Sequence, residues 1–369
     1  MKILYVSDLA GLGGGEVSLL NIMKEMKKKY SVVLLSRVNG KLVDEAVEQD
    51  IKVEVYDFKR NLFNSFFKFR NIIKKNGIDV VHSNELTTGI ILGIFLQIIN
   101  KKVVNVCTCH GQWYELSFIK KFFIKRVIKH IYCVSQSVED NLHKQGIYNT
   151  SVSYLGIDLD KYHRDERKIE ELKSNLGVDL LDRKIVITTI GRYQEIKGQL
   201  KGVKAIKKLY KYYPNIIYLL VGDNIYNSEK DKEYKNKVEN FIKNNQMEKY
   251  VYILGERRDI PEIMGLSDYI MIPSDNESFG MVAIESLAAD KIIISTPCDG
   301  VKEILDNNSL LISKTNDEDG LFLCLKELIS CPKKREEVKE EIGDLKFKFS
   351  IVNTCNHYVE FYKKRKEDY

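Results

Sequence analysis

The chain has 369 residues, 44 % of them hydrophobic, which is enough for two globular domains of ordinary size, each with its own core. The longest uncharged apolar stretch, residues 89–99, is much shorter than the roughly 20 residues of a membrane-spanning helix, so we expect a core helix there. The formal net charge is +6, but residues 1–155 hold 22 Lys and Arg against 14 Asp and Glu, a net charge of +8, so the basic excess lies in the first half.

The cysteines and the first residues indicate the compartment. Seven cysteines form neither a C-x-x-C pair nor the regular framework of a disulfide-rich domain. The opening residues lack the apolar core of a signal peptide, because Ser7 and Asp8 directly follow a short apolar run. We therefore expect reduced, mostly buried thiols in a cytoplasmic protein.

The first half of the chain alternates short apolar segments with helical ones. Residues 1–36 read as strand, glycine loop, helix and strand, which is the opening of a βαβ unit. Further strands are expected at 51–56, 79–83, 103–108 and 131–134. This order predicts a doubly wound parallel sheet.

Two segments of the first half, 58–75 and 118–130, alternate Lys and Arg with Phe and Ile. The pattern fits helices that lie on an anionic membrane surface. It fits equally well helices that pack their apolar side chains inward and leave the lysines in water. Nucleic acid is not expected as a partner, because no nucleic-acid recognition motif accompanies the charge.

Residues 152–184 break the pattern with charged and polar side chains, so a domain boundary is expected there, with domains at 1–165 and 166–349. The second domain repeats the alternation with continuous apolar strands, which are typical of parallel sheets buried on both faces. Its strands are expected at 184–190, 215–223, 250–255, 268–274, 291–296 and 309–313. A charged helix over 353–369 ends the sequence, and the chain from about 350 is expected to pack back onto the first domain. The predicted fold class is α/β, with two Rossmann-like doubly wound domains.

Four loops carry unusual residues at the carboxyl ends of predicted strands, where open α/β sheets bind their ligands. The first is GLGGGE, residues 11–16, whose glycines allow main-chain N–H groups to approach a phosphate at a helix N-terminus. Glu16 occupies the position of the third glycine of a dinucleotide fingerprint, and no Walker A lysine follows. A tight turn without a ligand is the alternative.

The second loop is IGRYQEIKGQL, residues 190–200, at the end of the first strand of the second domain. Arg192 and Lys197 bracket this loop, and the next helix is expected to start near Lys197. A guanidinium fork and an ammonium group at one helix N-terminus suit a diphosphate. The alternative is two solvated cations.

The third loop carries Glu277 and leads into an apolar helix that contains Glu285. Ser278 is a good N-cap, so the helix is expected to begin there, with Glu277 directly before its N-terminus. Acids eight positions apart would then lie within about a quarter-turn of each other on one side of the helix. Both carboxylates can accept hydrogen bonds from sugar hydroxyls, and the N–H groups of residues 279–281 can bind phosphate oxygens.

The fourth loop lies in the first half, where a strand ends at His110-Gly111. The imidazole could be a hydrogen-bond partner or a weak acid-base group, although a single histidine is more often structural. The six histidines form no Ser-His-Asp order, no metal-ligand cluster and no Cys-His pair, so no metal site is expected.

Together these residues resemble the retaining glycosyltransferases of the GT-B fold, glycosyltransferase family 4, also called group 1 transferases. The resemblance covers nearly the whole chain. Its most specific parts are NESFGMVAIESLAADK, similar to the E-x7-E element of the family, and GRYQEIKG, similar to its Arg-Lys loop. Weaker agreement comes from GGGE, CHG and SYLGIDLDKY. The loop TPCDGVKEIL departs from the family, which more often has two glycines and a proline before the glutamate, although Glu303 still fits that position.

The resemblance implies two domains that face each other across a cleft, with a nucleotide-diphospho-sugar bound mainly by the second half. It implies sugar transfer with retention of configuration, without a metal ion and without any cofactor beyond this co-substrate. Arg192 and Lys197 would neutralise the diphosphate, Glu277 would face the transferred sugar and Glu285 would bind the ribose hydroxyls. The implied catalytic residues are Glu277, His110, Arg192 and Lys197, and the implied donor-binding residues are Arg192, Lys197, Glu285, Gly14, Ser278, Phe279, Gly280 and Met281.

The acceptor is less determined than the donor. Acceptors in the family include lipid-linked sugars, polysaccharides, proteins and small metabolites. The basic and aromatic segments favour a glycan or lipid-linked acceptor, bound by a cytoplasmic protein or by one that is peripheral on the inner face of the membrane. Two other classes stay open, a non-hydrolysing sugar-nucleotide epimerase and a nucleotide-sugar-binding module without turnover.

Overall fold

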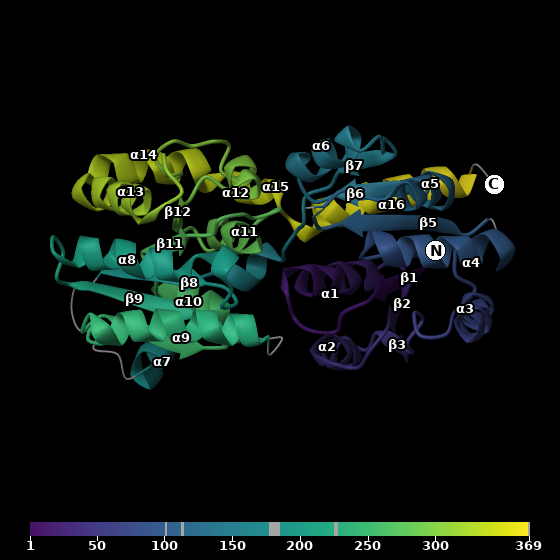
Figure 1. Cartoon of the computed structure of the whole chain (residues 1–369), viewed down its shortest axis with the longest axis horizontal. Helices are drawn as coiled ribbons and strands as arrows, with labels where there is room; N and C mark the ends of the chain where they lie inside the picture. Colours follow the sequence, from purple (N-terminus) through teal and green to yellow (C-terminus); the bar gives the residue numbers. More distant parts are fainter. Residues whose placement is uncertain (100–101, 112–113, 177–184, 225–227, 368–369) are drawn as a thin grey trace. The chain divides into compact units, whose positions relative to one another are not determined.

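A computed structural model describes residues 1–99, 102–111, 114–176, 185–224 and 228–367 (Figure 1). The chain forms two compact units. Unit 1 contains Met1–Ile157 and the chain from Phe349 onward, and unit 2 contains Asp158–Lys348. The division falls earlier than the boundary after residue 165 that the sequence suggested. Part of the polar segment that suggested it, residues 177–184, lies outside the described residues, as do residues 368 and 369 of the helix expected over 353–369.

Unit 1 contains a parallel sheet of seven strands in the order β3-β2-β1-β4-β5-β6-β7. The strands are β1 (Lys2–Ser7), β2 (Ser31–Ser36), β3 (Lys52–Val55), β4 (Val80–Ser83), β5 (Val104–Cys109), β6 (His130–Cys133) and β7 (Thr150–Val152). The expected strands of the first half are all present, and β7 is an additional short edge strand. The α/β fold class is therefore confirmed for this unit.

The helices of unit 1 cover both faces of this sheet. They are α1 (Gly14–Lys27), α2 (Lys41–Glu48), α3 (Leu62–Asn76), α4 (Leu86–Ile99), α5 (Phe118–Val127), α6 (Gln136–Lys144) and α16 (Ile351–Glu367). Alternate side chains of β1 point to opposite faces. Ile3 and Tyr5 pack with α1, α2 and α16, whereas Leu4 and Val6 pack with α3 and α4. Helix α5 packs against α4, and the expected core helix over 89–99 is the buried part of α4.

Helix α16 is attached to unit 1 by a buried polar and aromatic cluster. Tyr358 and Tyr362 are fully buried, and the Tyr362 hydroxyl contacts His82 Nδ1. His82 Nε2 lies 2.7 Å from the Thr108 hydroxyl. Burial lowers the pKa of His82 to about 3, so the imidazole is neutral and can satisfy one partner on each nitrogen. Helix α16 is thereby part of the core of unit 1.

Unit 2 contains a parallel sheet of five strands in the order β10-β9-β8-β11-β12. The strands are β8 (Ile185–Ile190), β9 (Ile216–Val221), β10 (Val251–Gly255), β11 (Tyr269–Ile272) and β12 (Ile292–Ser295). The expected sixth strand, 309–313, is wrong, because only Ile312 forms a bridge, with Ser295. The main-chain N–H groups of Leu311 and Ile312 donate back to the Asn308 carbonyl, so these residues form turns instead of an extended strand.

The helices that the structure describes in unit 2 range from short 3-10 turns to the 16 residues of α9. They are η1 (Leu159–Tyr162), α7 (Glu166–Leu176), η2 (Glu195–Lys197), α8 (Gln199–Tyr210), α9 (Glu229–Asn244), α10 (Ile260–Leu266), α11 (Met281–Ala288), α12 (Asp299–Ile304), α13 (Glu318–Ser330), α14 (Pro332–Gly343) and α15 (Leu345–Lys348). Helix α8 packs against α9 and α13, and α10 packs against α7. Within the described residues, no helix of either unit combines the length and apolar content that crossing a membrane requires.

Each sheet has one place where the strand order reverses direction. In unit 1 the chain runs outward from β1 to β3 and then returns to place β4 on the other side of β1. In unit 2 it runs from β8 to β10 and then places β11 on the other side of β8. Ligands of open α/β sheets bind at the carboxyl ends of the two strands that flank such a reversal. The loops after β1 and β4, and after β8 and β11, are therefore the first places to look for a site.

Candidate functional site

The two loops at the strand reversal of unit 2 are joined by an ion pair between Lys197 and Glu277. Lys197 Nζ lies 2.7 Å from Glu277 Oε1 and 2.9 Å from Oε2. The Ser274 hydroxyl donates to Glu277 Oε1 at 2.7 Å. The lysine and glutamate side chains are 26 % and 15 % exposed, so the pair is largely shielded from water but can be reached by a ligand. Two fixed donors, the Lys197 ammonium group and the Ser274 hydroxyl, orient the Glu277 carboxylate.

The backbone explains how Lys197 reaches this position. Lys197 ends η2, and Gly198 follows it with a φ of +68°, in the left-handed region. A Cβ atom on Gly198 would lie 1.9 Å from the Pro273 carbonyl oxygen, so only glycine permits this approach. The Asp275 N–H also donates to the Ile196 carbonyl at 2.7 Å. The loop after β8 therefore lies directly against the loop after β11.

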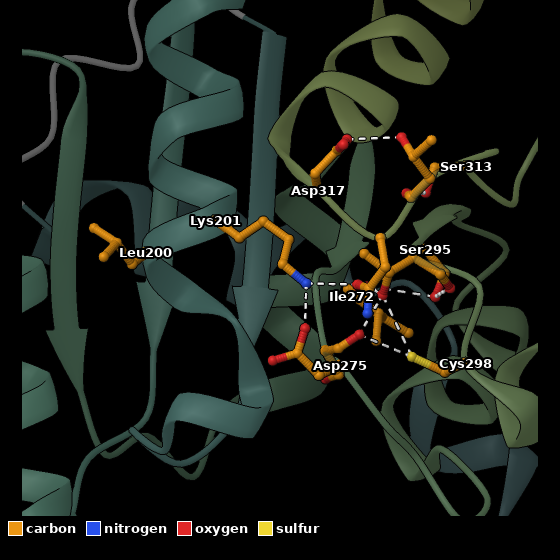
Figure 2. Close-up of polar contacts among 12 residues, drawn as sticks. Leu200, Lys201, Ile272, Asp275, Ser295, Cys298, Ser313 and Asp317 are labelled. Carbon is orange, nitrogen blue, oxygen red and sulfur yellow. Dashed lines mark hydrogen bonds and ion pairs between the residues drawn. The ribbon is translucent and has the colours of Figure 1, made fainter.

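Further contacts hold the loop after β11 from two sides (Figure 2). Lys201 of α8 reaches Asp275, with Nζ 2.6 Å from Oδ1. On the other side, Cys298 Sγ lies 2.9 Å from the Ser274 carbonyl oxygen, and the Thr296 hydroxyl donates to the same oxygen. Ser274 and Glu277 are thus carried by a segment whose main chain is anchored independently of the ion pair.

Arg192 lies in the same loop as Lys197, two residues after β8. Its main-chain carbonyl accepts a hydrogen bond of 2.7 Å from Gln199 Nε2, and Gln199 is buried in the first turn of α8. Gly222, with a φ of +133°, allows the end of β9 to approach Gly191 in this loop. The backbone that carries the arginine is therefore fixed to α8 and β9.

The helix with the second acid starts later than the sequence suggested. Helix α11 begins at Met281, and its N-cap is Gly280, with a φ of +114° and no side-chain capping bond. Ser278 is therefore not the N-cap, which corrects that expectation. Glu277 and Ser278 belong to the loop, together with the buried Phe279. The helical spacing that would place Glu277 and Glu285 on one side of a helix does not apply, because only Glu285 is helical.

Glu285 lies within α11 and forms a hydrogen bond with the Tyr162 hydroxyl of η1. Burial raises the pKa of Glu285 to about 7, although the Tyr162 hydrogen bond and the Lys161 charge act in the opposite direction. The carboxyl is therefore close to half-protonated near neutral pH, and a ligand that donates hydrogen bonds to it would favour its ionised form. Sequence reasoning did not single out Tyr162 or Ser274. Ser274 had a detectable signal, a hydroxyl at the end of the strand that precedes Glu277.

His110 and Gly14, the predicted site residues of the first half, belong to unit 1. His110 Nε2 lies 2.7 Å from Asn84 Oδ1, which can only accept, so Nε2 carries the proton. Burial lowers the pKa of His110 to about 4, so the ring is neutral and its Nδ1 is an acceptor. A Cβ atom on Gly15 would lie 3.6 Å from this ring. Because Gly15 lies against the His110 ring, the histidine and the glycine turn form one cluster. Gly14, at the first position of α1, is the exposed residue of this turn.

The comparisons with known proteins agree with this geometry. Residues 175–343 match the family model for glycosyl transferases group 1, and residues 12–161 match the model for glycosyltransferase family 4. The chain is 24 % identical over 300 residues to the capsular polysaccharide biosynthesis glycosyltransferase CapH of Staphylococcus aureus, with 80 % of this chain and 81 % of that protein covered. It is 25 % identical over 351 residues to an Escherichia coli UDP-Gal:α-D-GlcNAc-diphosphoundecaprenol α-1,3-galactosyltransferase, with 89 % and 86 % covered.

The fold is also that of solved structures. The Anabaena protein HepE in complex with UDP superposes with a TM-score of 0.85 at 20 % sequence identity, over 99 % of this chain and 100 % of that one. Such a likeness establishes the two-unit GT-B fold, whereas the two family models together account for most of the sequence. The chain is therefore a glycosyltransferase of the GT-B fold and belongs to family 4, the group 1 glycosyl transferases, which is a retaining family.

Proposed function

We propose that the chain transfers a hexosyl group from a nucleotide-diphospho-sugar to an acceptor hydroxyl, with retention of anomeric configuration and without a metal ion. The observation that carries this proposal is the Lys197–Glu277 pair at the strand reversal of unit 2, whose lysine lies in the same loop as Arg192. A cation to hold a diphosphate and a carboxylate to hold sugar hydroxyls are thereby available side by side.

In the reaction, the bond between the anomeric carbon and the β-phosphate oxygen breaks, and its electron pair moves onto the diphosphate. The acceptor oxygen bonds to the anomeric carbon, and its proton passes to the departing diphosphate. Negative charge therefore builds up on the leaving group, and Arg192 and Lys197 stabilise it. Because both cations sit on a loop that is already anchored, they need little reorganisation as this charge develops.

The other predicted residues receive roles around the donor. Glu277 accepts hydrogen bonds from the transferred sugar, and Glu285 accepts them from the ribose. The start of α11 favours phosphate oxygens, because the N-terminal end of a helix attracts anions. In unit 1, Gly14 permits close approach of the donor, and the neutral His110 is a hydrogen-bond partner for its sugar. The residues at the start of α11 are Ser278, Phe279, Gly280 and Met281.

Relatives support a setting in the assembly of cell-surface polysaccharide or glycolipid. The Staphylococcus aureus relative acts in capsular polysaccharide biosynthesis, and the Escherichia coli relative uses a UDP-sugar and a lipid-linked acceptor. The Anabaena structure contains UDP. We therefore propose a UDP-sugar as donor and a glycan or lipid-linked acceptor. A sugar-nucleotide epimerase and a binding module without turnover are the alternatives.

Exposed aromatic residues support contact with an anionic membrane surface. On α5, Phe118, Ile119 and Phe122 are 84 %, 67 % and 52 % exposed, whereas Ile124 and Val127 face the core. Inward packing thus accounts for only part of the apolar side chains of this helix. The basic side chains of the same segment complement anionic lipid headgroups. They are Lys120, Lys121, Lys125, Arg126 and Lys129. This contact would place the protein at the inner face of the cytoplasmic membrane.

The three candidate functions differ in what happens to a bound donor. Calorimetry against UDP-, GDP-, ADP- and dTDP-sugars, with a chelator present, identifies the donor class. We expect one nucleotide sugar to bind and to release its nucleoside diphosphate with the sugar joined to an added acceptor. A changed donor sugar without acceptor would establish the epimerase instead, and binding without any product across a broad acceptor panel would favour the binding module.

Lys197→Ala is expected to lower kcat about 100-fold or more while changing the dissociation constant of the donor less than about fivefold. The reason is that the ammonium group acts mainly on charge that develops in the transition state. Steady-state kinetics and calorimetry measure the two quantities. The control is Lys204→Ala, which removes a cation of α8 that pairs with Glu318. Equal losses in turnover and in donor binding would contradict the role given to Lys197.

The raised pKa of Glu285 predicts that donor binding depends on pH. Its carboxyl is mostly protonated below its pKa of about 7 and ionised above it, and only the ionised form can accept both ribose hydroxyls. Affinity for UDP-glucose, a diphosphate diester, is therefore expected to rise between about pH 6 and pH 8. Glu285→Gln should bind more weakly and without this rise, whereas Glu336→Gln, a change on the surface of α14, should behave as the wild type. The same rise in Glu285→Gln would exclude Glu285 as its source.

The membrane contact is tested by flotation with anionic vesicles. Replacement of Lys120, Lys121, Lys125 and Arg126 by Gln is expected to release the protein from vesicles that contain phosphatidylglycerol, because each lost charge costs about 1 kcal/mol of attraction. The matched control replaces four exposed lysines of α9 and α14 by Gln: Lys230, Lys237, Lys333 and Lys339. If both variants bind the vesicles as the wild type does, the basic residues of α5 are only a solvated helix surface.

A further inference from the structure

The strand reversal of unit 1 carries a second group of charged side chains, which the donor site does not use. Asp8 follows β1, Arg37 follows β2, Lys59 lies beyond β3, and Glu85 follows β4. Arg37 Nε lies 2.5 Å from Asp8 Oδ1, and Lys59 Nζ lies 2.6 Å from Asp8 Oδ2. Lys59 Nζ is also 3.9 Å from Glu85 Oε2. We call Asp8, Arg37, Lys59 and Glu85 the unit 1 edge cluster.

The edge cluster is partly shielded but accessible. The Asp8 side chain is 14 % exposed, those of Arg37 and Lys59 are each 28 % exposed, and that of Glu85 is 35 % exposed. The cluster continues directly into the histidine group, because Asn84, which bonds to His110, precedes Glu85 in the chain. A ligand at the strand reversal of unit 1 would therefore meet both groups.

The charges of the edge cluster compensate one another. Arg37 and Lys59 both pair with Asp8, and Arg37 also lies 3.8 Å from Asp57. Burial and the neighbouring Asp8 charge raise the pKa of Glu85 to about 7. An anionic ligand would find no surplus of cations here and would have to compete with Asp8 for them. A neutral polyhydroxyl compound could instead donate to the carboxylates and accept from the cations without separating them.

We propose that the edge cluster binds the acceptor. We infer that the sugar unit of the acceptor bound there is neutral and carries no phosphate or carboxylate group. Each hydroxyl of such a sugar can donate to one cluster carboxylate and accept from a neighbouring cation. Asp8 is the central group, because it contacts both cations and lies at the reversal itself. This proposal rests on the proposed transferase function and specifies the chemical class of its acceptor.

In the test, the full-length protein is incubated with its donor at saturating concentration and with one member of a pair of acceptors. The two members of each pair are matched in structure, and one is neutral while the other is anionic. The pairs are octyl glucoside with octyl glucuronide, octyl galactoside with octyl galacturonide, and glucose with glucose 6-phosphate. We expect transfer, followed by mass spectrometry, to be at least about tenfold more efficient to a neutral member than to its anionic partner. Asp8→Asn should raise the KM of that neutral acceptor about tenfold or more, since a charge-assisted hydrogen bond is lost. Donor affinity, measured by calorimetry, should not change.

Asp44→Asn on α2 is the matched control, because it removes an exposed carboxylate of the same unit outside the cluster. Lys59→Gln is the second cluster variant, for use if Asp8→Asn does not fold, and it should give the same KM effect. Preference for the anionic members, no transfer to any neutral member, or an unchanged KM in a folded cluster variant would each overturn the proposal. A wild-type protein that binds no nucleotide sugar would instead refute the proposed transferase function.

Discussion

The reversal of strand order beside the first strand of each sheet is the constraint on which the rest of the molecule depends. It decides which two loops become neighbours, although they are far apart in the sequence. In unit 2 this constraint joins Lys197 to Glu277 across 80 positions. In unit 1 it groups Asp8 with Glu85. In a parallel sheet without the reversal, the same residues would lie along one edge of the sheet, but the loops that carry them would not flank a common site.

The ion pairs at both reversals also determine how these sites can respond to a ligand. Lys197 already pairs with Glu277, so a diphosphate bound as we propose would share the ammonium group with a carboxylate and would not meet an isolated cation. In the proposed reaction this lysine would stabilise the diphosphate as negative charge grows there, while the Ser274 hydroxyl continues to hold the carboxylate. In that role a paired cation would favour the charge-separated transition state over the ground state, which is the requirement for catalysis.

Most strands and the loop with Lys197 could be predicted from the sequence, because continuous apolar runs and cations at strand ends are local patterns. The start of α11 could not be predicted from the sequence. Ser278 has the side chain of an N-cap, but Gly280 can adopt a φ of +114°, and the close packing of Gly300 of α12 against Phe279 holds the preceding loop out of the helix. The strand expected at 309–313 is wrong for a similar reason, since turns around Asn308 outweigh the β propensity of these residues. Tyr162 meets Glu285 through tertiary packing, which no local pattern records.

The two proposals for unit 1 concern the same edge of its sheet. A helix that returns between parallel strands begins at the carboxyl edge, where the edge cluster lies. Helix α5 begins with the exposed Phe118 and Ile119, and α3 begins with Leu62 and Phe63, soon after Lys59. Exposed apolar residues therefore lie in the first turns of both α3 and α5. An acceptor with a neutral sugar attached to a lipid would suit this arrangement, since its sugar needs paired donors and acceptors while its lipid would stay in the membrane that α5 is proposed to contact.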